Sequence, residues 1–316
     1  MGLPQCNSAS RHVGFVGVGL MGHGLAKHAL ARGHRVSLLV RNASARERNQ
    51  DLLDAGAHAV EVAAELAAQC DVVVMCVTGS PQVEDVVFGS SGLLSQARPG
   101  TVFVDCTTAL PESSRRVAAA LATKGAHFLD AALTGTPKEA EDGQVNLLVG
   151  GDPAVLEQVR DVLSSFSRQI YECGDVGAGH SVKLLHQFVV LSNAAVLAEA
   201  FSCAQKTGVN LQTLCGVIGS GGANSTAFQR LSAFVVDGND QLFRFSLANA
   251  LKDMQYYTRM SSDAQTVSAV AGVVHNSYAV ANNTGLGERY VPHLIQSLNK
   301  MNGIESVDEP PKSGNP

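Results

Sequence analysis

The chain has 316 residues, of which 45% are hydrophobic and 16% charged, and its formal net charge at pH 7 is −5. This length predicts about two domains, and the composition is that of a folded globular protein. The acidic balance argues against a nucleic-acid or anionic-membrane binder, because both usually carry excess basic residues. No uninterrupted apolar run approaches about 18 residues, so we expect no membrane partner. The polar start, Met1–His12, has no apolar core of the kind found in signal peptides.

The cysteine and histidine patterns argue against disulfides and metal. The seven Cys are odd in number, no pair is spaced Cys-x-x-Cys, and most lie in apolar runs. We therefore expect neither a disulfide framework nor a zinc site, and a reducing cytoplasm is the simplest location. The ten His are scattered without a His-x-x-x-His pair, so no metal site is predicted.

Short apolar runs alternate with helix-like stretches through the first half of the chain. Such alternation predicts βαβ units and a doubly wound parallel sheet, here a Rossmann-type dinucleotide-binding domain over residues 12–174. Ser44 is a candidate cap for a helix that reaches Asp54. The predicted strands are residues 12–17, 35–40, 71–77, 101–104, 126–129, 145–149 and 169–171, and the other predicted helices are 20–32 and 111–123.

The character of the sequence changes after Gly174. One long helix is predicted over Ala178–Thr207, and its apolar centre predicts that it is buried. Further helices follow, broken at residues 219–222, 238–240 and 285–287. The sequence thus predicts an all-α domain over residues 175–301, which serves substrate binding and oligomerisation and is joined to the first domain by the long helix. The ends, 1–11 and 302–316, are predicted to be disordered.

Three glycines follow the first predicted strand and open the first helix. Gly17 permits a tight turn, Gly19 allows the backbone to approach a pyrophosphate, and Gly22 allows close packing of helix and strand. The N–H groups at the helix start then hold the anion, with Leu20 and Met21 beside it. A glycine-rich turn without a ligand is the alternative interpretation.

The end of the second strand bears on the choice of cofactor. NAD sites usually place Asp or Glu there for the ribose 2′-hydroxyl, whereas this chain has Arg41 and Asn42. A guanidinium suits a 2′-phosphate, so the sequence favours NADP over NAD. Alternatively, Arg41 is solvated or stacks on the adenine.

Five motifs in order resemble those of the β-hydroxyacid dehydrogenase family, which includes 3-hydroxyisobutyrate dehydrogenases and tartronate semialdehyde reductases. The resemblance extends over about residues 12–300. It implies transfer of hydride between NADP(H) or NAD(H) and a small β-hydroxy acid or its semialdehyde. The five motifs are residues 17–22, 105–111, 130–136, 177–187 and 252–253.

Departures from the family pattern in two of the motifs bear on the substrate. The turn after Asp130 has Ala132 for Pro, Thr134 for Ser and Thr136 for the second Gly, which narrows the pocket or adds a hydroxyl. The helix has His186-Gln187, as in threonate dehydrogenase-like members, where 3-hydroxyisobutyrate dehydrogenases carry Asn-Asn. These departures favour a more hydroxylated acid.

The resemblance assigns a role to each candidate residue. Lys183 is the general acid and base, which requires burial or a nearby cation to lower its pKa. Thr134, Gly135, Thr136, His186 and Gln187 bind a substrate carboxylate or hydroxyl, although His186 could instead anchor the helix. Without the family, Thr108 would be a helix-capping hydroxyl and Lys252 an exposed charge. As cofactor-binding residues the resemblance adds Val77, Thr78, Thr108 and Lys252.

Two other functions stay open. Imine reductases share this fold but usually replace the catalytic lysine, so Lys183 argues against that activity. Other relatives keep the fold as a non-catalytic interaction module, usually with added segments that this chain lacks. The apolar centre of the long helix also predicts a homo-oligomer, either a dimer or a tetramer.

Overall fold

The computed structural model describes residues 10–304. Disorder is predicted for residues 1–11 and 302–316, and most of these residues lie outside the described range. Contacts divide the chain into two compact units, the first ending at Lys183 and the second beginning at Leu184. The domain boundary at Gly174 stays a prediction, and each unit is described by itself.

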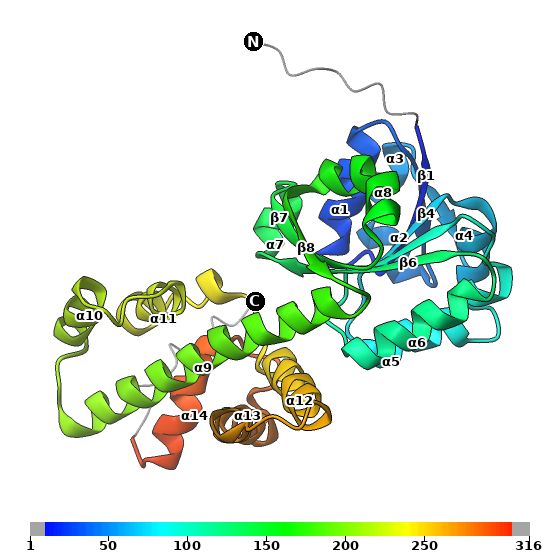
Figure 1. Ribbon diagram of the computed structural model, residues 1–316. Coiled ribbons are helices and arrows are strands. Elements are labelled where there is room, and N and C mark those ends of the chain that lie inside the picture. Colours follow the sequence, from blue (N-terminus) through cyan, green and yellow to red (C-terminus); the bar gives the residue numbers. More distant parts are fainter. Residues whose placement is uncertain (1–9, 305–316) are drawn as a thin grey trace, which may run out of the picture. The chain divides into compact units, whose positions relative to one another are not determined.

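The first unit is built on one eight-stranded sheet, in the order β3-β2-β1-β4-β5-β6-β7-β8 (Figure 1). Neighbouring strands are parallel except β6 and β7, which are antiparallel. The predicted Rossmann-type fold is therefore confirmed, with one antiparallel pair added. The strands are β1 His12–Val16, β2 Arg35–Leu39, β3 His58–Val60, β4 Val72–Met75, β5 Val102–Asp105, β6 His127–Thr134, β7 Val145–Gly150 and β8 Ser167–Gly174.

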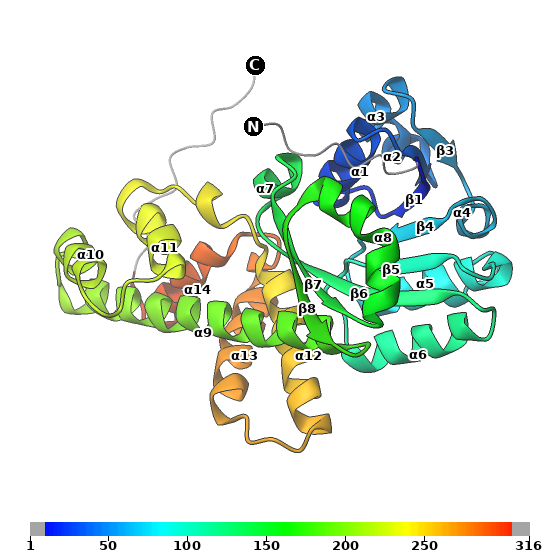
Figure 2. The same cartoon turned by 45° about the horizontal axis from the view of Figure 1, so that its top comes forward.

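Helices cover both faces of this sheet, as Figure 2 shows. Side chains of β4 alternate between the two layers: Val72 and Val74 pack with α1, α3 and α8, whereas Val73 and Met75 pack with α4, α5 and α6. A strand buried on both faces has to be apolar throughout, as this one is. The helices are α1 Gly22–Ala31, α2 Ala43–Arg48, α3 Gln50–Asp54, α4 Ala63–Gln69, α5 Ser80–Phe88, α6 Pro111–Ala122, α7 Pro137–Glu141 and α8 Pro153–Phe166.

Two sequence predictions for this unit are wrong in detail. The helix expected from Ser44 to Asp54 is two short helices, and the cap is Asn42, whose side chain accepts from the Ala45 N–H at 2.8 Å. The Ser44 hydroxyl instead accepts from Arg48. The strand expected at 126–129 continues to Thr134, because its second half pairs with β7 beyond the end of β5.

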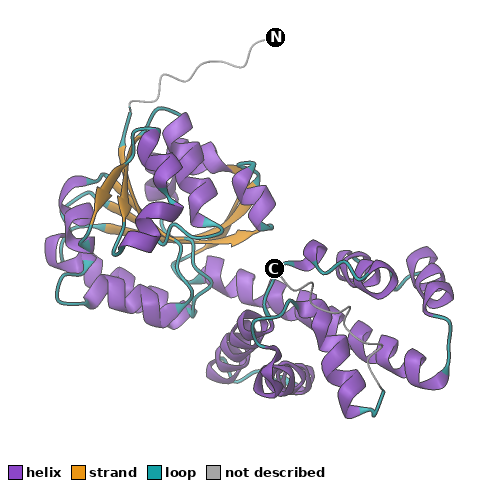
Figure 3. Ribbon diagram, turned by 180° about the vertical axis from the view of Figure 1, so that it is seen from behind, coloured by secondary structure: helices purple, strands orange, loops and turns teal. Residues whose placement is uncertain are grey.

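The second unit is helical, and Figure 3 shows no strand in its described part. Its core includes Leu191, Phe201, Met254 and Tyr278, and the Tyr278 hydroxyl donates to the Leu191 carbonyl at 2.9 Å. The all-α character predicted from the sequence is confirmed. The helices are α9 Ala178–Thr207, which begins in the first unit, α10 Leu211–Ser220, α11 Thr226–Asp237, α12 Leu247–Asp263, α13 Ala269–Ala281 and α14 Leu294–Met301.

Helix α9 has the predicted bounds but is not buried on all sides. An apolar stripe on it is exposed at Leu185, Val189 and Val196. By length and composition α9 alone among the helices of residues 10–304 would also suffice to cross a membrane. Core helices of soluble proteins pass the same test, so this feature does not assign the helix to a membrane.

Candidate active site

The glycine turn between β1 and α1 has the space and the donors that a pyrophosphate needs. Gly17 has φ +85°, and a Cβ there would lie 2.2 Å from the Cys76 carbonyl oxygen. A Cβ on Gly22 would lie 2.1 Å from the Gly17 carbonyl oxygen, whereas a Cβ on Gly19 would meet nothing within 4 Å. The first turn of α1 has no side-chain cap and no acidic residue. The helix start therefore fits an anionic ligand, which the open side at Gly19 can admit.

The residues beside the glycine turn and after β2 differ in how freely they could contact a ligand. Leu20 is exposed and Met21 partly buried. Arg41 follows β2 with an exposed guanidinium 3.8 Å from the carboxylate of Asp85. An exposed pair at this distance contributes little to stability, so the guanidinium can exchange partners. Asn42 cannot offer its side-chain oxygen freely, because that atom caps α2.

The loops after β4 and β5 are tied together by a threonine that the sequence did not single out. The Val77 N–H donates to Oγ1 of the buried Thr107 at 3.1 Å, and the Thr107 N–H donates to Oδ1 of Asp105 at 3.0 Å. Thr108 is partly exposed and Thr78 exposed. No side chain caps α6, so the interpretation of Thr108 as its cap is wrong. The sequence could not tell which of two adjacent threonines faces inward.

Three buried polar residues lie below these loops. The Ser114 hydroxyl and Nδ1 of His180 are 2.6 Å apart, and both residues are almost fully buried. Burial raises the pKa of Asp105 although the nearby His180 acts in the opposite direction. Oδ2 of Asp105 and Nε2 of His180 have no hydrogen-bond partner within the described range. Asp105 is the last residue of β5, Ser114 lies in α6 and His180 lies in the first turn of α9.

The turn Thr134-Gly135-Thr136 is closed by its own hydrogen bonds. The Thr136 N–H donates to Oε2 of Glu139 at 2.7 Å, and the Glu139 N–H donates to Oγ1 of Thr136 at 3.3 Å. Oγ1 of Thr134 accepts from the side chain of Asn146 at 3.1 Å. The family resemblance implies that this turn binds a substrate hydroxyl or carboxylate. The structure shows that the Thr136 N–H is already bonded to one.

Helix α7, which follows this turn, packs directly on the nucleotide helix α1. A Cβ on Gly24 would lie 2.2 Å from the Ala140 carbonyl oxygen, and Gly143 lies against the ring of His28. Lys27 of α1 also pairs with Glu141, and this hydrogen bond lowers the pKa of the Glu141 carboxyl. The glycine turn and the Thr134–Thr136 turn are thus parts of one packed body.

The start of α9 is bonded to the sheet through Asp130 of β6. Oδ1 of Asp130 accepts from the Gly177 N–H at 2.6 Å and Oδ2 accepts from the His180 N–H at 2.8 Å. A Cβ on Gly179 would lie 2.9 Å from Oδ2 of Asp130 and 2.2 Å from the Leu148 carbonyl oxygen. Only a glycine lets the helix lie this close to the strands. Lys183 follows one turn after His180 and is partly buried.

In the second unit, Gln187 and Lys252 both contact the carboxylate of Asp253. Nε2 of Gln187 donates to Oδ2 of the buried Asp253 at 2.7 Å. Nζ of Lys252 lies 3.2 Å from Oδ1 of the same carboxylate and 5.5 Å from the ring centre of Tyr256. His186 is exposed, and its Nδ1 lies 3.3 Å from Oε1 of Gln187. Gln187 is one turn beyond Lys183, so both project from the same face of α9.

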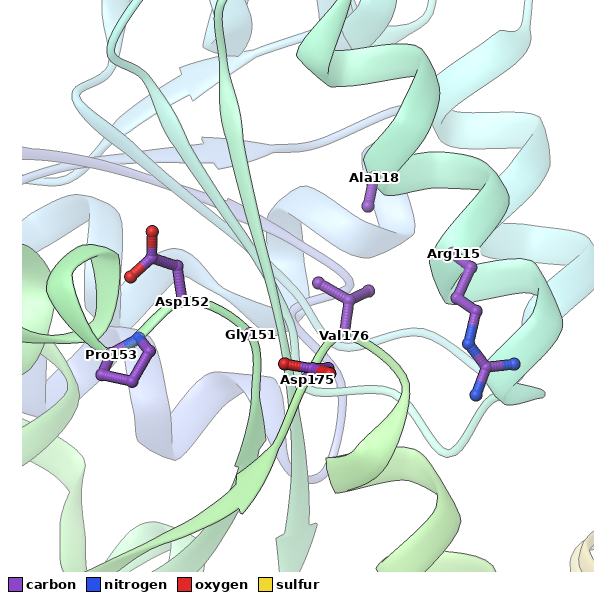
Figure 4. Close-up of a pocket in the computed structure, with 7 residues that line it drawn as sticks. All are labelled: Arg115, Ala118, Gly151, Asp152, Pro153, Asp175 and Val176. Carbon is purple, nitrogen blue, oxygen red and sulfur yellow. The ribbon is translucent and has the colours of Figure 1, made fainter.

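A pocket of about 630 Å³ lies elsewhere on the first unit, between α6 and the loops after β7 and β8. Figure 4 shows Arg115 on one side of it and Asp152 on the other. The Asp152 carboxylate is engaged in capping α8. None of the predicted site residues lines this pocket, and residues 10–304 contain no cluster of His, Cys, Asp or Glu suited to a metal.

Comparison with known proteins shows which family the chain belongs to. Residues 12–174 match the NAD binding domain of 6-phosphogluconate dehydrogenase, and residues 177–298 match the NAD-binding family of NADP-dependent 3-hydroxyisobutyrate dehydrogenase. The chain belongs to the β-hydroxyacid dehydrogenase family. Members of this family are NAD(P)-dependent oxidoreductases, and the first domain of this chain is accordingly an NAD-binding domain.

Individual members of the family show the extent of the likeness. The 2-(hydroxymethyl)glutarate dehydrogenase of Eubacterium barkeri is 29% identical over 92% of this chain and 96% of its own length. A 3-hydroxyisobutyrate dehydrogenase structure from Salmonella typhimurium has a TM-score of 0.80 at 28% identity, covering 91% of this chain and 99% of that one. The Mycobacterium tuberculosis 3-hydroxyisobutyrate dehydrogenase with L-serine has a TM-score of 0.79 at 25% identity, covering 92% and 99%.

Two further comparisons differ in kind. An imine reductase of Myxococcus stipitatus with NADP⁺ is 20% identical with a TM-score of 0.61, covering 91% of this chain and 99% of that one, and this likeness shows the fold alone. The human cytokine-like nuclear factor N-PAC is 29% identical over 93% of this chain, which spans 51% of that protein.

Proposed function

We propose that this protein is an NADP-preferring dehydrogenase or reductase for a small β-hydroxy acid and its semialdehyde. One observation carries the proposal. The glycine turn, the Thr134–Thr136 turn and the helix with Lys183 are bonded or packed to one another within a single unit, through Gly24 and Asp130. Such convergence of the family's motifs on one rigid body suits a reaction that needs cofactor and substrate held together.

The residues of the first unit fit a dinucleotide. In the proposal the helix start at Gly19–Gly22 holds the pyrophosphate, with Leu20 and Met21 beside it, and Arg41 holds a 2′-phosphate with Asn42 beside it. The loops at Val77, Thr78 and Thr108 contact the ribose and nicotinamide, and Lys252 contributes from the second unit. A bound nicotinamide would supply the hydride chemistry, accepting a hydride from the hydroxyl-bearing carbon of the substrate or donating one to its carbonyl carbon.

The protein's own task is to move a proton at the substrate oxygen. Lys183 performs it in the proposal: a neutral amine takes the hydroxyl proton in oxidation, and the ammonium gives a proton to the carbonyl oxygen in reduction. Gln187 projects from the same face of α9 with its amide fixed by Asp253. A fixed amide can hold a substrate oxygen beside the amine without the entropy loss that a mobile side chain incurs.

The proposal includes an oligomer and a cytoplasmic location. The exposed stripe of Leu185, Val189 and Val196 on α9 is the surface that a second copy would cover. The reducing cytoplasm suits the six cysteines of the described range, all of which are free.

A panel assay at 340 nm tests the function. NADPH and NADH are each offered with tartronate semialdehyde, glyoxylate, succinic semialdehyde and methylmalonate semialdehyde, and the oxidised cofactors with glycerate, threonate, 3-hydroxyisobutyrate and serine. We expect turnover that Lys183→Ala lowers by about 10²–10⁴-fold, the usual contribution of a general acid and base. Lys206→Ala, at the far end of the same helix, serves as the control and should keep full activity.

Other outcomes of this assay point to the alternatives. Turnover that survives in Lys183→Ala contradicts the assigned chemistry. Absence of turnover with all acids and semialdehydes, together with reduction of a cyclic imine, identifies an imine reductase. If no substrate is turned over but NADPH still binds, the protein is a non-catalytic nucleotide-binding module.

A further inference from the structure

The carboxyl group of Asp105 is buried at the end of β5 and has no part in the proton transfer assigned to Lys183. Asp105 is only 1% exposed. Its Oδ1 accepts from the Thr107 N–H at 3.0 Å, whereas its Oδ2 has no hydrogen-bond partner within the described range. A buried carboxylate with an unpartnered oxygen is costly unless it is protonated or a positive charge lies nearby. The protonation of this group is therefore sensitive to a charge that binds beside it.

The titratable groups around Asp105 come from the ends of β4 and β5, from β6 and from α9. Burial raises the pKa of Asp105, while His180 acts in the opposite direction and Asp130 adds to the increase. Burial also raises the pKa of the Cys76 thiol to about 12 and that of the Cys106 thiol well above its usual range. Since both thiols stay neutral, a charge that appears beside this cluster acts on the carboxyl of Asp105 or on the imidazole of His180.

The ends of β4 and β5 lie beside the glycine turn, on the side away from Arg41. A Cβ on Gly17 would lie 2.2 Å from the carbonyl oxygen of Cys76, which follows β4, and Met75 of β4 is paired with Asp105 of β5. Arg41, the proposed contact of the 2′-phosphate, follows β2 on the other side of β1. A dinucleotide whose pyrophosphate lies on the glycine turn therefore extends its nicotinamide over the ends of β4 and β5.

One residue links the Asp105 carboxyl to the loop that contacts the nicotinamide in the proposed function. Thr107 donates its N–H to Asp105, and its Oγ1 accepts from the Val77 N–H at 3.1 Å. Asp105 itself is covered by these loops, so it acts on a bound ligand through space and not by contact. Charges in a protein interior interact over several ångströms, because the surroundings screen them less than water does.

We propose that Asp105 distinguishes the oxidised from the reduced cofactor by changing its own charge. The nicotinamide ring of NADP⁺ is positively charged, whereas that of NADPH is neutral. An ionised carboxylate stabilises the positive ring, and a protonated carboxyl suits the neutral ring. Binding of NADP⁺ therefore releases the proton of Asp105 to solvent, and binding of NADPH does not. The inference rests on the dinucleotide site of the proposed function and does not depend on the substrate or on Lys183.

Raising the pH should consequently favour the oxidised cofactor. NADP⁺ binds best to the ionised form of Asp105, so its Kd falls as the pH rises through the pKa of this group in the free protein. The 2′-phosphate is common to NADP⁺ and NADPH, and its titration cancels in the ratio of their two Kd values. We expect the ratio of the NADP⁺ Kd to the NADPH Kd to fall about 10-fold between pH 6 and pH 8.5.

Calorimetric titration of the complete protein with each cofactor measures this ratio at both pH values. Asp105→Asn keeps an oxygen for the Thr107 N–H but carries no charge, so its ratio should change less than about 2-fold over the same range. Asp71→Asn is the matched control. Asp71 precedes β4 at the opposite edge of the sheet, where its carboxylate accepts from the His12 N–H at 2.9 Å. This control should keep the pH dependence of the wild type.

The number of protons released gives a test that needs no variant. Titrations in two buffers of different ionisation enthalpy count these protons, and NADP⁺ should release more of them from the wild type than NADPH does. His180→Gln separates the imidazole from the carboxyl. It should keep a pH-dependent ratio with a midpoint at higher pH, because His180 lowers the pKa of Asp105. Loss of the pH dependence in His180→Gln together with its persistence in Asp105→Asn would assign the proton to the imidazole and overturn the inference.

The outcomes separate the inference from the proposed function. A wild-type ratio that is constant from pH 6 to pH 8.5, or one that changes equally in Asp105→Asn, overturns the inference while the dehydrogenase stands. A pH-dependent ratio without turnover of any hydroxy acid or semialdehyde overturns the proposed activity and leaves the inference in place. If the protein prefers NAD, the ratio for NAD⁺ and NADH provides the same test, because that pair differs by the same charge. Absence of binding of every dinucleotide overturns both.

Discussion

The carboxylate of Asp130, in the middle of β6, accepts a 2.8 Å hydrogen bond from the backbone N–H of His180, in the first turn of α9. Its other oxygen accepts from the Gly177 N–H, so both oxygens accept hydrogen bonds from the start of one helix. A carboxylate at a helix N-terminus stabilises the unpaired N–H groups and the helix dipole. The same strand ends at Thr134, and Asp130 therefore fixes the distance between the proposed substrate turn and the helix that carries Lys183.

Asp130→Asn is expected to lower kcat at least 10-fold while changing the NADPH Kd less than 3-fold. An asparagine supplies one acceptor oxygen, but its NH₂ group faces the second backbone N–H, so the first turn of α9 shifts and Lys183 with it. Losing a buried charged hydrogen bond also costs about 1–3 kcal/mol of folding stability. Steady-state kinetics, NADPH titration and the pH profile of kcat measure these effects.

Ser114→Ala is the matched control for this prediction. It removes the side-chain contact to His180 but leaves both backbone bonds to Asp130 in place. We expect nearly normal kcat from it. Equal kcat in the two variants would show that Asp130 holds the fold without positioning the lysine.

Much of the fold could be predicted because it depends on local pattern. The bounds of α9 follow from the apolar run between Gly177 and Gly208, and the sheet follows from apolar strands such as β4. Gly17 and Gly22 were identifiable because the turn between strand and helix leaves no room for a side chain at either residue.

The parts that sequence reasoning missed depend on contacts between distant residues. Gln187 and Asp253 are 66 residues apart, and no spacing rule joins them. Asn42 and Ser44 are both good caps by residue type, and the sequence does not show that Asn42 is the one that accepts from the Ala45 N–H. Glu139 is three residues from Thr136, the spacing of a capping box, so this contact could have been found.

Arg41→Ala is expected to weaken NADPH binding at least 10-fold and NADH binding less than 3-fold, because only NADPH offers a 2′-phosphate to the guanidinium. Asp85→Asn should do the opposite and tighten NADPH binding a few-fold, since it frees Arg41 from a competing anion 3.8 Å away. Fluorescence titration with both cofactors measures all four constants. Equal losses for the two cofactors in Arg41→Ala would remove the basis for NADP preference.

Asp105→Asn is expected to stabilise the protein, and more so at higher pH. Burial raises the pKa of Asp105 in the folded state, so the folded protein holds this proton more tightly than the unfolded chain does. Its contribution to stability is therefore full below the unfolded pKa of about 3.9 and is lost as the pH rises through the folded pKa. Asparagine keeps an oxygen for the Thr107 N–H and carries no charge.

Thermal unfolding at pH 5 and pH 8 tests this prediction. The Tm gain of Asp105→Asn over the wild type should be larger at pH 8, by a few degrees if about 1 kcal/mol is recovered. The exposed Asp85→Asn should change Tm little at either pH. A gain that does not grow between pH 5 and pH 8 would mean that the folded protein already keeps Asp105 ionised at pH 5.

The apolar stripe on α9 is expected to form the interface of a dimer or tetramer. Leu185, Val189 and Val196 are 49%, 58% and 66% exposed, and they project from one side of the helix at spacings of four and seven residues. Light scattering should give two or four times the chain mass of 33.0 kDa. Val189→Glu places a charge in the stripe and should shift the mass to that of one chain, whereas Val62→Glu, on the first unit, should not. A wild-type mass of 33.0 kDa would mean that the stripe is not covered by a second copy.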